Sequence, residues 1–438
     1  MKKLSVCLVL AVAVGLVLGC SGAKKTGRNA AGEIEVTIPH YKTGQNVGAV
    51  FFLPQIERFN KKYAGTYKIV IEEIVQDMYN EKMMQLGQQK KLPVLLEGGG
   101  NQEWYRDFII PGNMFVDLKP WLDAHPDIKN RLTPENIAYN TTNDGKIFSV
   151  GYPVVRPIGI YYNTTLYQPS KSFAETTWDA VLAELGSNKI ALMTGENAFS
   201  TQLVLSSLIA SEPGGKEILQ AGFVNKITDF NKKPLIDAIA KLQNLFRNYA
   251  SSNAVGAVYA DAANSFMSKN AALIANGSWM MGDFANTNSD KWSNGFNGAD
   301  VHGSVFPGNI AVGGMGIGYS WWISSNATDD EKQLAYAYLE FILSPEELEQ
   351  YMLIEGGTTP RMELSDSFLA KRAENRLMEE YIGAVNADTV LCPTWEEAVL
   401  PSIASSDFPR LLPLLATGRM TAQEFCAELT DKAAESAF

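Results

Sequence analysis

The segment Asn270-Ala-Ala-Leu-Ile-Ala-Asn-Gly-Ser-Trp279 is the part of the sequence that decides the fold. Ala271–Ala275 is a short apolar run bounded by turn residues, which is the pattern of a strand buried on both faces. Asn276–Ser278 then supplies a tight turn and a helix N-cap. Trp279 therefore follows the carboxyl end of a buried strand, where open α/β sheets hold their ligands. Its flat ring suits stacking on a sugar, and a core position is the alternative.

The longer segment FMSKNAALIANGSW (Phe266–Trp279) resembles the signature F-x-x-G-x-A-A-M-x-x-x-G-x-W. This is the signature of the family 1 extracellular solute-binding proteins of ABC importers, the maltose-binding-protein-like group. Lys269 stands where the signature has Gly, and Leu273 replaces the usual Met. The change at Leu273 is mild, because Leu has a volume similar to that of Met.

Other segments resemble the family pattern in the expected order and together cover nearly the whole mature chain. They are Val116–Asp127, Asp144–Val154, Ile160–Tyr167, Glu175–Leu185, the strand after Gly313-Gly314, and Glu355–Met362. The Asp of the family's turn before the third strand is missing at Lys90–Val94, so the resemblance implies the strand there but no role for an Asp.

The resemblance implies an α/β, two-lobed periplasmic-binding-protein fold of type II, in which each lobe is a mixed or parallel sheet flanked by helices. Three hinge crossings are expected, near Tyr152–Pro157, His302–Pro307 and Ile342–Pro345. The N-lobe would comprise residues 33–153 plus 306–343, and the C-lobe residues 156–303 plus 345–438. The ligand would lie between the lobes and be captured by hinge closure.

Length and composition agree with this expectation. A chain of 438 residues points to two domains, and 46% hydrophobic with 19% charged residues describes a packed globular protein. The net charge is −11, and no basic run follows the first thirty residues. This argues against a nucleic-acid partner, whose phosphates require a basic face.

The N-terminus has the features of an export signal. Lys2 and Lys3 precede the apolar stretch Leu4–Leu18, which is too short to span a bilayer comfortably. Val17-Leu-Gly-Cys20 resembles a bacterial lipobox. We therefore expect residues 1–19 to be a lipoprotein signal peptide, Cys20 to be lipidated, and residues 20–32 to include a flexible tether. An ordinary signal peptide with an incidental Cys is the alternative. The protein would be extracytoplasmic and anchored to the membrane by its lipid.

Two cysteines remain in the mature chain after Cys20, namely Cys392 and Cys426. They could pair outside the cytoplasm, and we expect two separate buried thiols instead. The three scattered His residues and these Cys show no metal-ligand spacing, so we expect no metal and no cofactor.

Periodicity predicts a β-loop-α repeat at the start of the mature chain. The predicted strands are Glu33–His40, Tyr67–Val75 and Leu92–Leu96, and the predicted helices are Phe52–Tyr63 and Tyr79–Lys91. Later helices are expected to begin at the capping boxes Thr328–Glu331, Ser344–Glu347 and Thr421–Glu424.

The candidate ligand-binding residues follow from their positions at strand ends, where amides and carboxylates suit sugar hydroxyls. They are Thr43, Gln45, Asn46, Gln76, Asp77, Asn101, Gln102, Arg156, Trp279, Tyr319, Trp321 and Trp322. Asp77 could instead cap a helix and Asn46 could close a turn. Trp321 and Trp322 are adjacent on a predicted strand, so their side chains point to opposite faces. We expect one in the core and the other in the cleft.

Four functions are compatible with these features. The first is a monomeric binding protein that delivers a carbohydrate to the transmembrane subunits of an ABC permease and performs no chemistry. The second is the same fold binding glycerol 3-phosphate or another polyol phosphate, which would require converging basic groups. The third is an extracytoplasmic hydrolase, but the sequence has no G-x-S-x-G and no H-E-x-x-H motif. The fourth is a sensor subunit for the same ligand.

Overall fold

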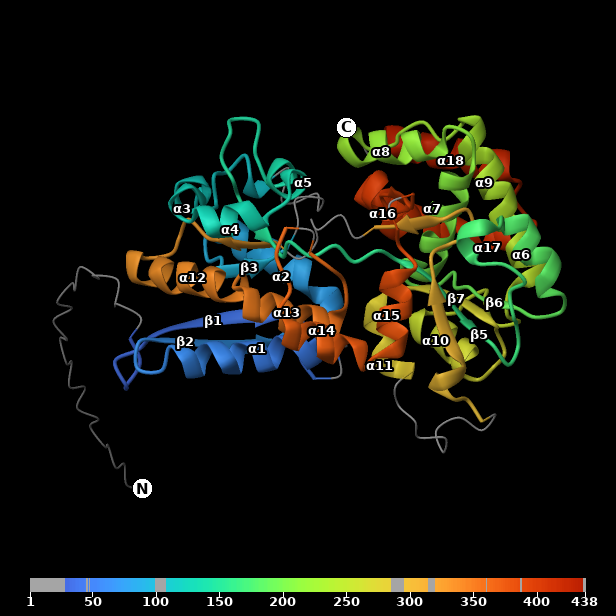
Figure 1. Cartoon of the computed structure of the whole chain (residues 1–438). Coiled ribbons are helices and arrows are strands. Elements are labelled where there is room, and N and C mark those ends of the chain that lie inside the picture. The colour runs from blue at the N-terminus through green and yellow to red at the C-terminus, as the bar shows by residue number, and fades with distance from the viewer. Residues whose placement is uncertain are drawn as a thin grey trace, which may run out of the picture.

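The computed structural model describes residues 28–44, 46, 48–98, 108–284, 295–313, 320–359, 361–386 and 388–435. The chain forms two α/β lobes that lie side by side (Figure 1). Each lobe has its own large hydrophobic core.

The first lobe contains the N-terminal strands. Its strands are β1 (Ile34–His40), β2 (Tyr67–Glu73), β3 (Leu95–Glu97), β4 (Val150–Gly151) and β10 (Ser320–Ile323). The strands β1 and β2 are parallel, and β10 lies antiparallel between β3 and β4. Its helices are α1 (Ala49–Lys62), α2 (Gln76–Gln88), α3 (Lys119–Ala124), α4 (Pro126–Arg131), α5 (Pro134–Tyr139), α12 (Asp329–Ile342), α13 (Pro345–Glu355) and α14 (Asp366–Ala373).

The second lobe is built on a four-stranded sheet of order β6-β7-β5-β8. These strands are β5 (Gly159–Asn163), β6 (Ile190–Ala191), β7 (Leu273–Asn276) and β8 (Val301–Ser304), and a separate parallel pair joins β9 (Ile310–Val312) to β11 (Val390–Cys392). The helices are α6 (Trp178–Leu185), α7 (Phe199–Ser211), α8 (Gly215–Asn225), α9 (Lys233–Asn244), α10 (Tyr259–Met267), α11 (Met281–Phe284), α15 (Arg376–Gly383), α16 (Trp395–Ala398), α17 (Phe408–Ala416) and α18 (Ala422–Glu435).

The decisive segment folds as its pattern predicts. All four residues of β7 are buried, and β7 lies between β6 and β5 inside the sheet. A short 3-10 helix, Ser278–Met280, follows directly, although no side chain caps its start. Trp279 therefore stands just beyond the carboxyl end of a buried central strand.

Two of the three predicted capping boxes form completely. Glu331 accepts from Thr328 N at 2.8 Å, and Glu424 accepts from Thr421 N at 2.8 Å. At the start of α13 the Ser344 hydroxyl accepts from Glu347 N at 3.4 Å. The Glu347 carboxylate does not return to Ser344, because it binds Arg58 of α1 at 2.6 and 2.7 Å.

The lobe boundaries differ from the expectation at two places. The chain leaves the core of the first lobe at Val154 and enters the core of the second lobe at Ile158. Phe306–Val312 packs in the core of the second lobe, whereas the expected boundary assigns residues 306–343 to the N-lobe. Leu348, Tyr351 and Phe368 place α13 and α14 on the first core, whereas the expected boundary assigns residues from 345 onward to the second lobe. The physical reason is packing against α1, where the Phe51 and Tyr351 ring centroids are 4.9 Å apart.

Cys392 and Cys426 are both buried and both free, so the prediction of two separate buried thiols is confirmed. Among the described residues, no helix combines the length and the apolar character needed to cross a membrane, and no cluster of His, Cys, Asp and Glu side chains is arranged to hold a metal ion.

Candidate binding site between the lobes

Strand direction places a set of polar residues at the inner edge of the first lobe. β1 and β2 run in parallel toward the second lobe, so their carboxyl ends face it (Figure 1). His40 ends β1, Lys42 and Thr43 follow it, and Glu97 ends β3. This is the edge at which α/β sheets present ligand-binding groups.

A buried network joins the ends of β1 and β3. Lys42 Nζ lies 2.7 Å from Glu97 Oε1, and His40 Nε2 lies 2.9 Å from Glu97 Oε2. Lys42 N donates to His40 Nδ1 at 3.0 Å, so the ring proton is on Nε2 and is donated to Glu97. Burial lowers the pKa of His40, which keeps the ring neutral. Burial alone would raise the pKa of Glu97, but Lys42 and His40 outweigh it and hold the pKa at about 2.

The second lobe contributes a group of three half-buried aromatic side chains, Phe199, Tyr259 and Trp279. The Phe199 and Trp279 ring centroids are 6.1 Å apart, and those of Phe199 and Tyr259 are 6.5 Å apart. The Tyr259 hydroxyl accepts from Asn276 Nδ2 at 3.0 Å. Half-buried rings with a polar rim suit a sugar, which has apolar faces and a ring of hydroxyls.

The turn that positions Phe199 has an unusual backbone. Glu196 and Ala198 have φ of 52° and 55°, in the left-handed region that residues with a Cβ rarely adopt. The Thr201 hydroxyl donates to Met193 O at 2.7 Å and accepts from Met193 N at 3.0 Å, which holds the start of α7 against the end of β6. Such backbone strain is concentrated at functional sites.

Arg156 lies in the first connection between the lobes and contacts both. Its guanidinium carbon is 5.4 Å from the Trp279 ring centroid and 5.4 Å from the Tyr351 ring centroid. Its Nη1 lies 3.1 Å from Glu355 Oε2. Arg156 therefore lies beside the predicted stacking residue, and its charge faces a carboxylate.

The other candidate residues have varied positions. Thr43 is buried beside the β1 network, and Asn46 accepts from Gly48 N at 2.9 Å, as a turn-closing residue does. Gln76 and Asp77 are the first two residues of α2, and the structure does not describe their side chains. Gln45, Asn101, Gln102 and Tyr319 lie outside the described residues.

The expectation that one of Trp321 and Trp322 faces the cleft is corrected. The two side chains do point to opposite faces of β10, but they are only 1% and 0% exposed. Trp321 packs in the main core of the first lobe, where its ring centroid is 5.1 Å from that of Tyr338. Trp322 packs in a smaller cluster. Both faces of β10 are covered, so neither ring offers a surface to a ligand in this structure.

Sequence reasoning missed Lys42, Glu97, Phe199 and Tyr259. Lys42 and Glu97 follow the same rule as Thr43, since they stand at strand ends, but their mutual contact requires the tertiary fold. Phe199 and Tyr259 begin helices α7 and α10 and are 60 residues apart in the sequence. No local pattern connects them with Trp279.

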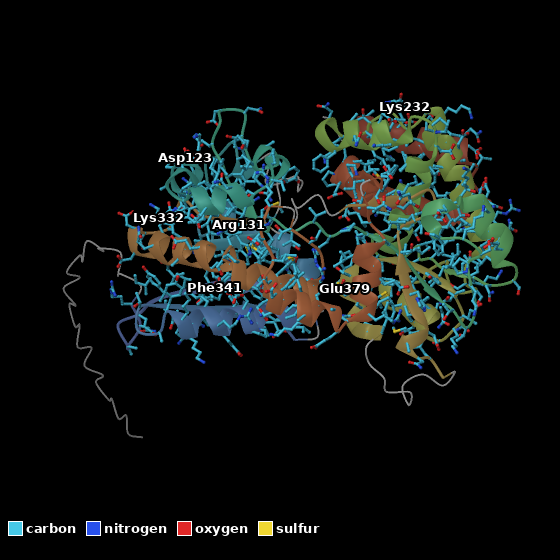
Figure 2. The ribbon with its side chains drawn as sticks, in the orientation of Figure 1. Asp123, Arg131, Lys232, Lys332, Phe341 and Glu379 are labelled. Carbon is cyan, nitrogen blue, oxygen red and sulfur yellow. The ribbon has the colours of Figure 1, made fainter. Side chains whose placement is uncertain are left out.

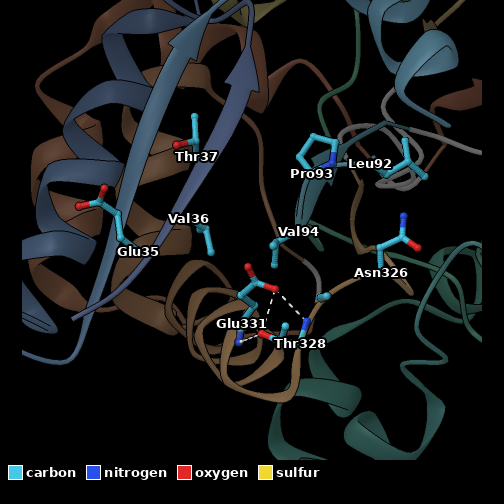
Figure 3. Close-up of a pocket in the computed structure, with 10 residues that line it drawn as sticks. Glu35, Val36, Thr37, Leu92, Pro93, Val94, Asn326, Thr328 and Glu331 are labelled. Atoms are coloured by element: carbon cyan, nitrogen blue, oxygen red, sulfur yellow. Dashed lines mark hydrogen bonds between the residues drawn. The ribbon is translucent and has the colours of Figure 1, made fainter. Parts of the chain in front are cut away.

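A pocket of about 420 Å³ lies elsewhere, in the first lobe. Figure 3 shows it between Glu35–Thr37 of β1, Leu92–Val94 before β3, and Asn326–Thr328 with Glu331 at the start of α12. The Glu331 carboxylate in it is already bonded to Thr328. Residues near the start of β1 line this pocket, and the strand ends described above do not.

The chain belongs to the bacterial extracellular solute-binding protein family, whose model matches residues 55–376. No curated protein sequence matches it. Among solved structures, it is similar to a chitin oligosaccharide binding protein, with 18% identity, a TM-score of 0.69, and coverage of 92% of this chain and 98% of the other.

Two further structures show the same fold. A Streptococcus pneumoniae solute-binding protein in complex with the blood group A-trisaccharide has 16% identity and a TM-score of 0.68, with 91% and 98% coverage. The sugar-binding protein MalE from Xanthomonas citri has 16% identity and a TM-score of 0.65, with 92% and 96% coverage. The fold is that of two-lobed solute-binding proteins, and the family is one of binding proteins.

Proposed function

We propose that this protein captures a carbohydrate between its two lobes and delivers it to the permease of an ABC importer, without performing chemistry. The observation that carries the proposal is the group of Phe199, Tyr259 and Trp279 beside Arg156, next to the connection between the lobes. Structural neighbours described as a chitin oligosaccharide binding protein, a complex with a blood group trisaccharide and a sugar-binding protein support the same class of ligand.

The paired charges at the candidate site favour a neutral sugar over a polyol phosphate. Lys42 faces the Glu97 carboxylate at 2.7 Å, and Arg156 faces the Glu355 carboxylate at 3.1 Å. A phosphate would have to compete with both carboxylates and would be repelled by them. Glycerol 3-phosphate and related ligands are therefore the weaker alternative.

A hydrolase is disfavoured by the positions of the histidines. His40 is buried and donates to Glu97, His302 Nδ1 lies 2.6 Å from Glu380, and His125 Nδ1 lies 2.7 Å from Trp121 O. A general acid or base must reach the substrate. Each of the three rings is engaged with other protein groups instead.

The proposal also includes lipid anchoring through Cys20, association with the transmembrane subunits of the permease, and a monomeric state. Cys20 is outside the described residues. Cys20→Ala should abolish labelling of the protein by a fatty acid fed to the cells, whereas continued labelling of the variant would contradict lipidation at Cys20.

The ligand class is tested by thermal unfolding of the chain from Ser21 onward against neutral sugars, oligosaccharides and polyol phosphates. A ligand at about 100 times its dissociation constant stabilises the folded state by about 2.7 kcal/mol. The proposal predicts stabilisation by neutral sugars. Stabilisation by phosphates alone would favour the alternative ligand.

A further inference from the structure

Arg156 is held between one aromatic ring from each lobe. Trp279 belongs to the second lobe and Tyr351 lies on α13 of the first, and the guanidinium carbon is 5.4 Å from each ring centroid. Arg156 Nη1 also lies 3.1 Å from Glu355, at the end of α13. The two charged side chains are only 12% and 15% exposed, so water screens their attraction weakly.

The turn after α13 strengthens the link between the lobes. The Ser278 hydroxyl, next to Trp279, donates to Glu355 O. Val155 and Thr358 exchange backbone hydrogen bonds of 2.8 and 2.9 Å, so the turn also pairs with the connection that carries Arg156.

Two glycines allow this close approach. Gly356 and Gly357 have φ of 78° and 108°. A Cβ on Gly356 would collide with Ser278, and a Cβ on Gly357 would collide with the side chains of Arg156 and Val154.

We propose that Arg156 is a positioning residue that links the orientation of Trp279 to the angle between the lobes. The inference rests on the proposed carbohydrate site. Hinge motion moves α13 relative to Trp279, and Arg156 contacts both, so the ring orientation and the lobe angle change together. A sugar that stacks on Trp279 would then bind one lobe arrangement better than the other, which is the requirement for ligand-driven closure. Direct hydrogen bonding of Arg156 to the sugar is the competing role.

The first measurement uses ligand-free protein labelled with fluorotryptophan. The ¹⁹F resonance of Trp279 is identified by its loss in Trp279→Phe. Arg156→Lys keeps the charge but loses the planar guanidinium, and Glu355→Gln removes the carboxylate. Both variants should shift the Trp279 resonance in the same direction. The matched control is Arg58→Lys, because Arg58 pairs with Glu347 on the same helix α13 but entirely within the first lobe.

The second measurement is the distance between spin labels at Asp123→Cys and Lys232→Cys, which lie on different lobes (Figure 2). The native Cys392 and Cys426 are buried and will not be labelled in the folded protein. Arg156→Lys and Glu355→Gln should shift the ligand-free distance distribution in the same direction, and Arg58→Lys should leave it unchanged. An unchanged distribution in both test variants overturns the proposal.

Sugar affinity separates the two roles of Arg156. Linkage predicts that Arg156→Lys and Glu355→Gln each weaken binding by about 5- to 150-fold and that the double variant is no weaker than the worse single variant. A loss confined to Arg156→Lys would show a direct contact and overturn the positioning role. If no sugar binds, the proposed function fails, while the resonance and distance measurements still decide the link between Trp279 and the lobes.

Discussion

Lys42 Nζ lies 2.7 Å from Glu97 Oε1, so a buried ion pair joins the loop after β1 to the end of β3. These segments are 55 residues apart in the sequence and form the inner edge of the first lobe. His40 Nε2 lies 2.9 Å from the second carboxylate oxygen of Glu97. The pair therefore fixes the geometry of the edge from which the first lobe would contact a ligand.

Lys42→Met should destabilise the first lobe by about 3–5 kcal/mol, because it leaves the Glu97 carboxylate buried without its main counter-charge. Urea unfolding at neutral pH measures the change. Lys119→Met is the surface control, since Lys119 pairs with the exposed Asp123 and should cost at most about 1 kcal/mol. Equal costs for the two variants would contradict the buried role of Lys42.

The pH dependence of the free energy of unfolding should reflect the titration of the Glu97 carboxylate. Its folded-state pKa is about 2, below the usual unfolded value of about 4.3. Its contribution is therefore complete above pH about 4.3 and is lost as the pH falls toward 2. The urea midpoint of the wild type should fall across that window, and the fall should be smaller in Glu97→Gln. Identical profiles for the two proteins would refute the assignment.

Trp279→Ala should weaken sugar binding by about 1–3 kcal/mol, because it removes the largest ring of the aromatic group. Isothermal titration calorimetry measures this loss. Trp395→Phe is the control, since Trp395 is buried in the core of the same lobe and should change stability without changing affinity. Unchanged affinity in Trp279→Ala with lower stability would assign Trp279 to the core.

Trp321→Ala should cost about 3–5 kcal/mol of folding free energy, as expected for a large ring removed from a packed core. The affinity per folded molecule should remain close to that of the wild type. A stable variant with greatly weakened sugar binding would show instead that Trp321 reaches the ligand.

Cys392 and Cys426 should react with a thiol reagent at pH 8 only after unfolding, because burial raises the pKa of both thiols to about 12. Counting modified thiols in native and urea-unfolded protein checks this. Rapid modification of either thiol under native conditions would contradict the buried position.

Local patterns predict local structure well in this chain. The buried strand before Trp279 and the helix starts at Thr328 and Thr421 depend on neighbouring residues, and the structure confirms them. The assignment of α13 to the first lobe could not be predicted, because it depends on the contact between Glu347 and Arg58, which are 289 residues apart in the sequence.

The same limit applies to the candidate site. Alternation along a strand predicts that Trp321 and Trp322 point in opposite directions, but not that both faces of β10 are covered. Conversely, Phe199 and Tyr259 have no sequence signal of their own, since their importance comes from lying beside Trp279.

The most direct test of carbohydrate capture between the lobes is to titrate the protein labelled at residues 123 and 232 with neutral oligosaccharides while measuring the distance between the lobes. We predict that a binding sugar shifts the distance distribution to a single closed population, and that Trp279→Ala requires about 5- to 150-fold more sugar for the same shift. Sugar binding without any change in that distribution, or closure by polyol phosphates alone, would contradict the account.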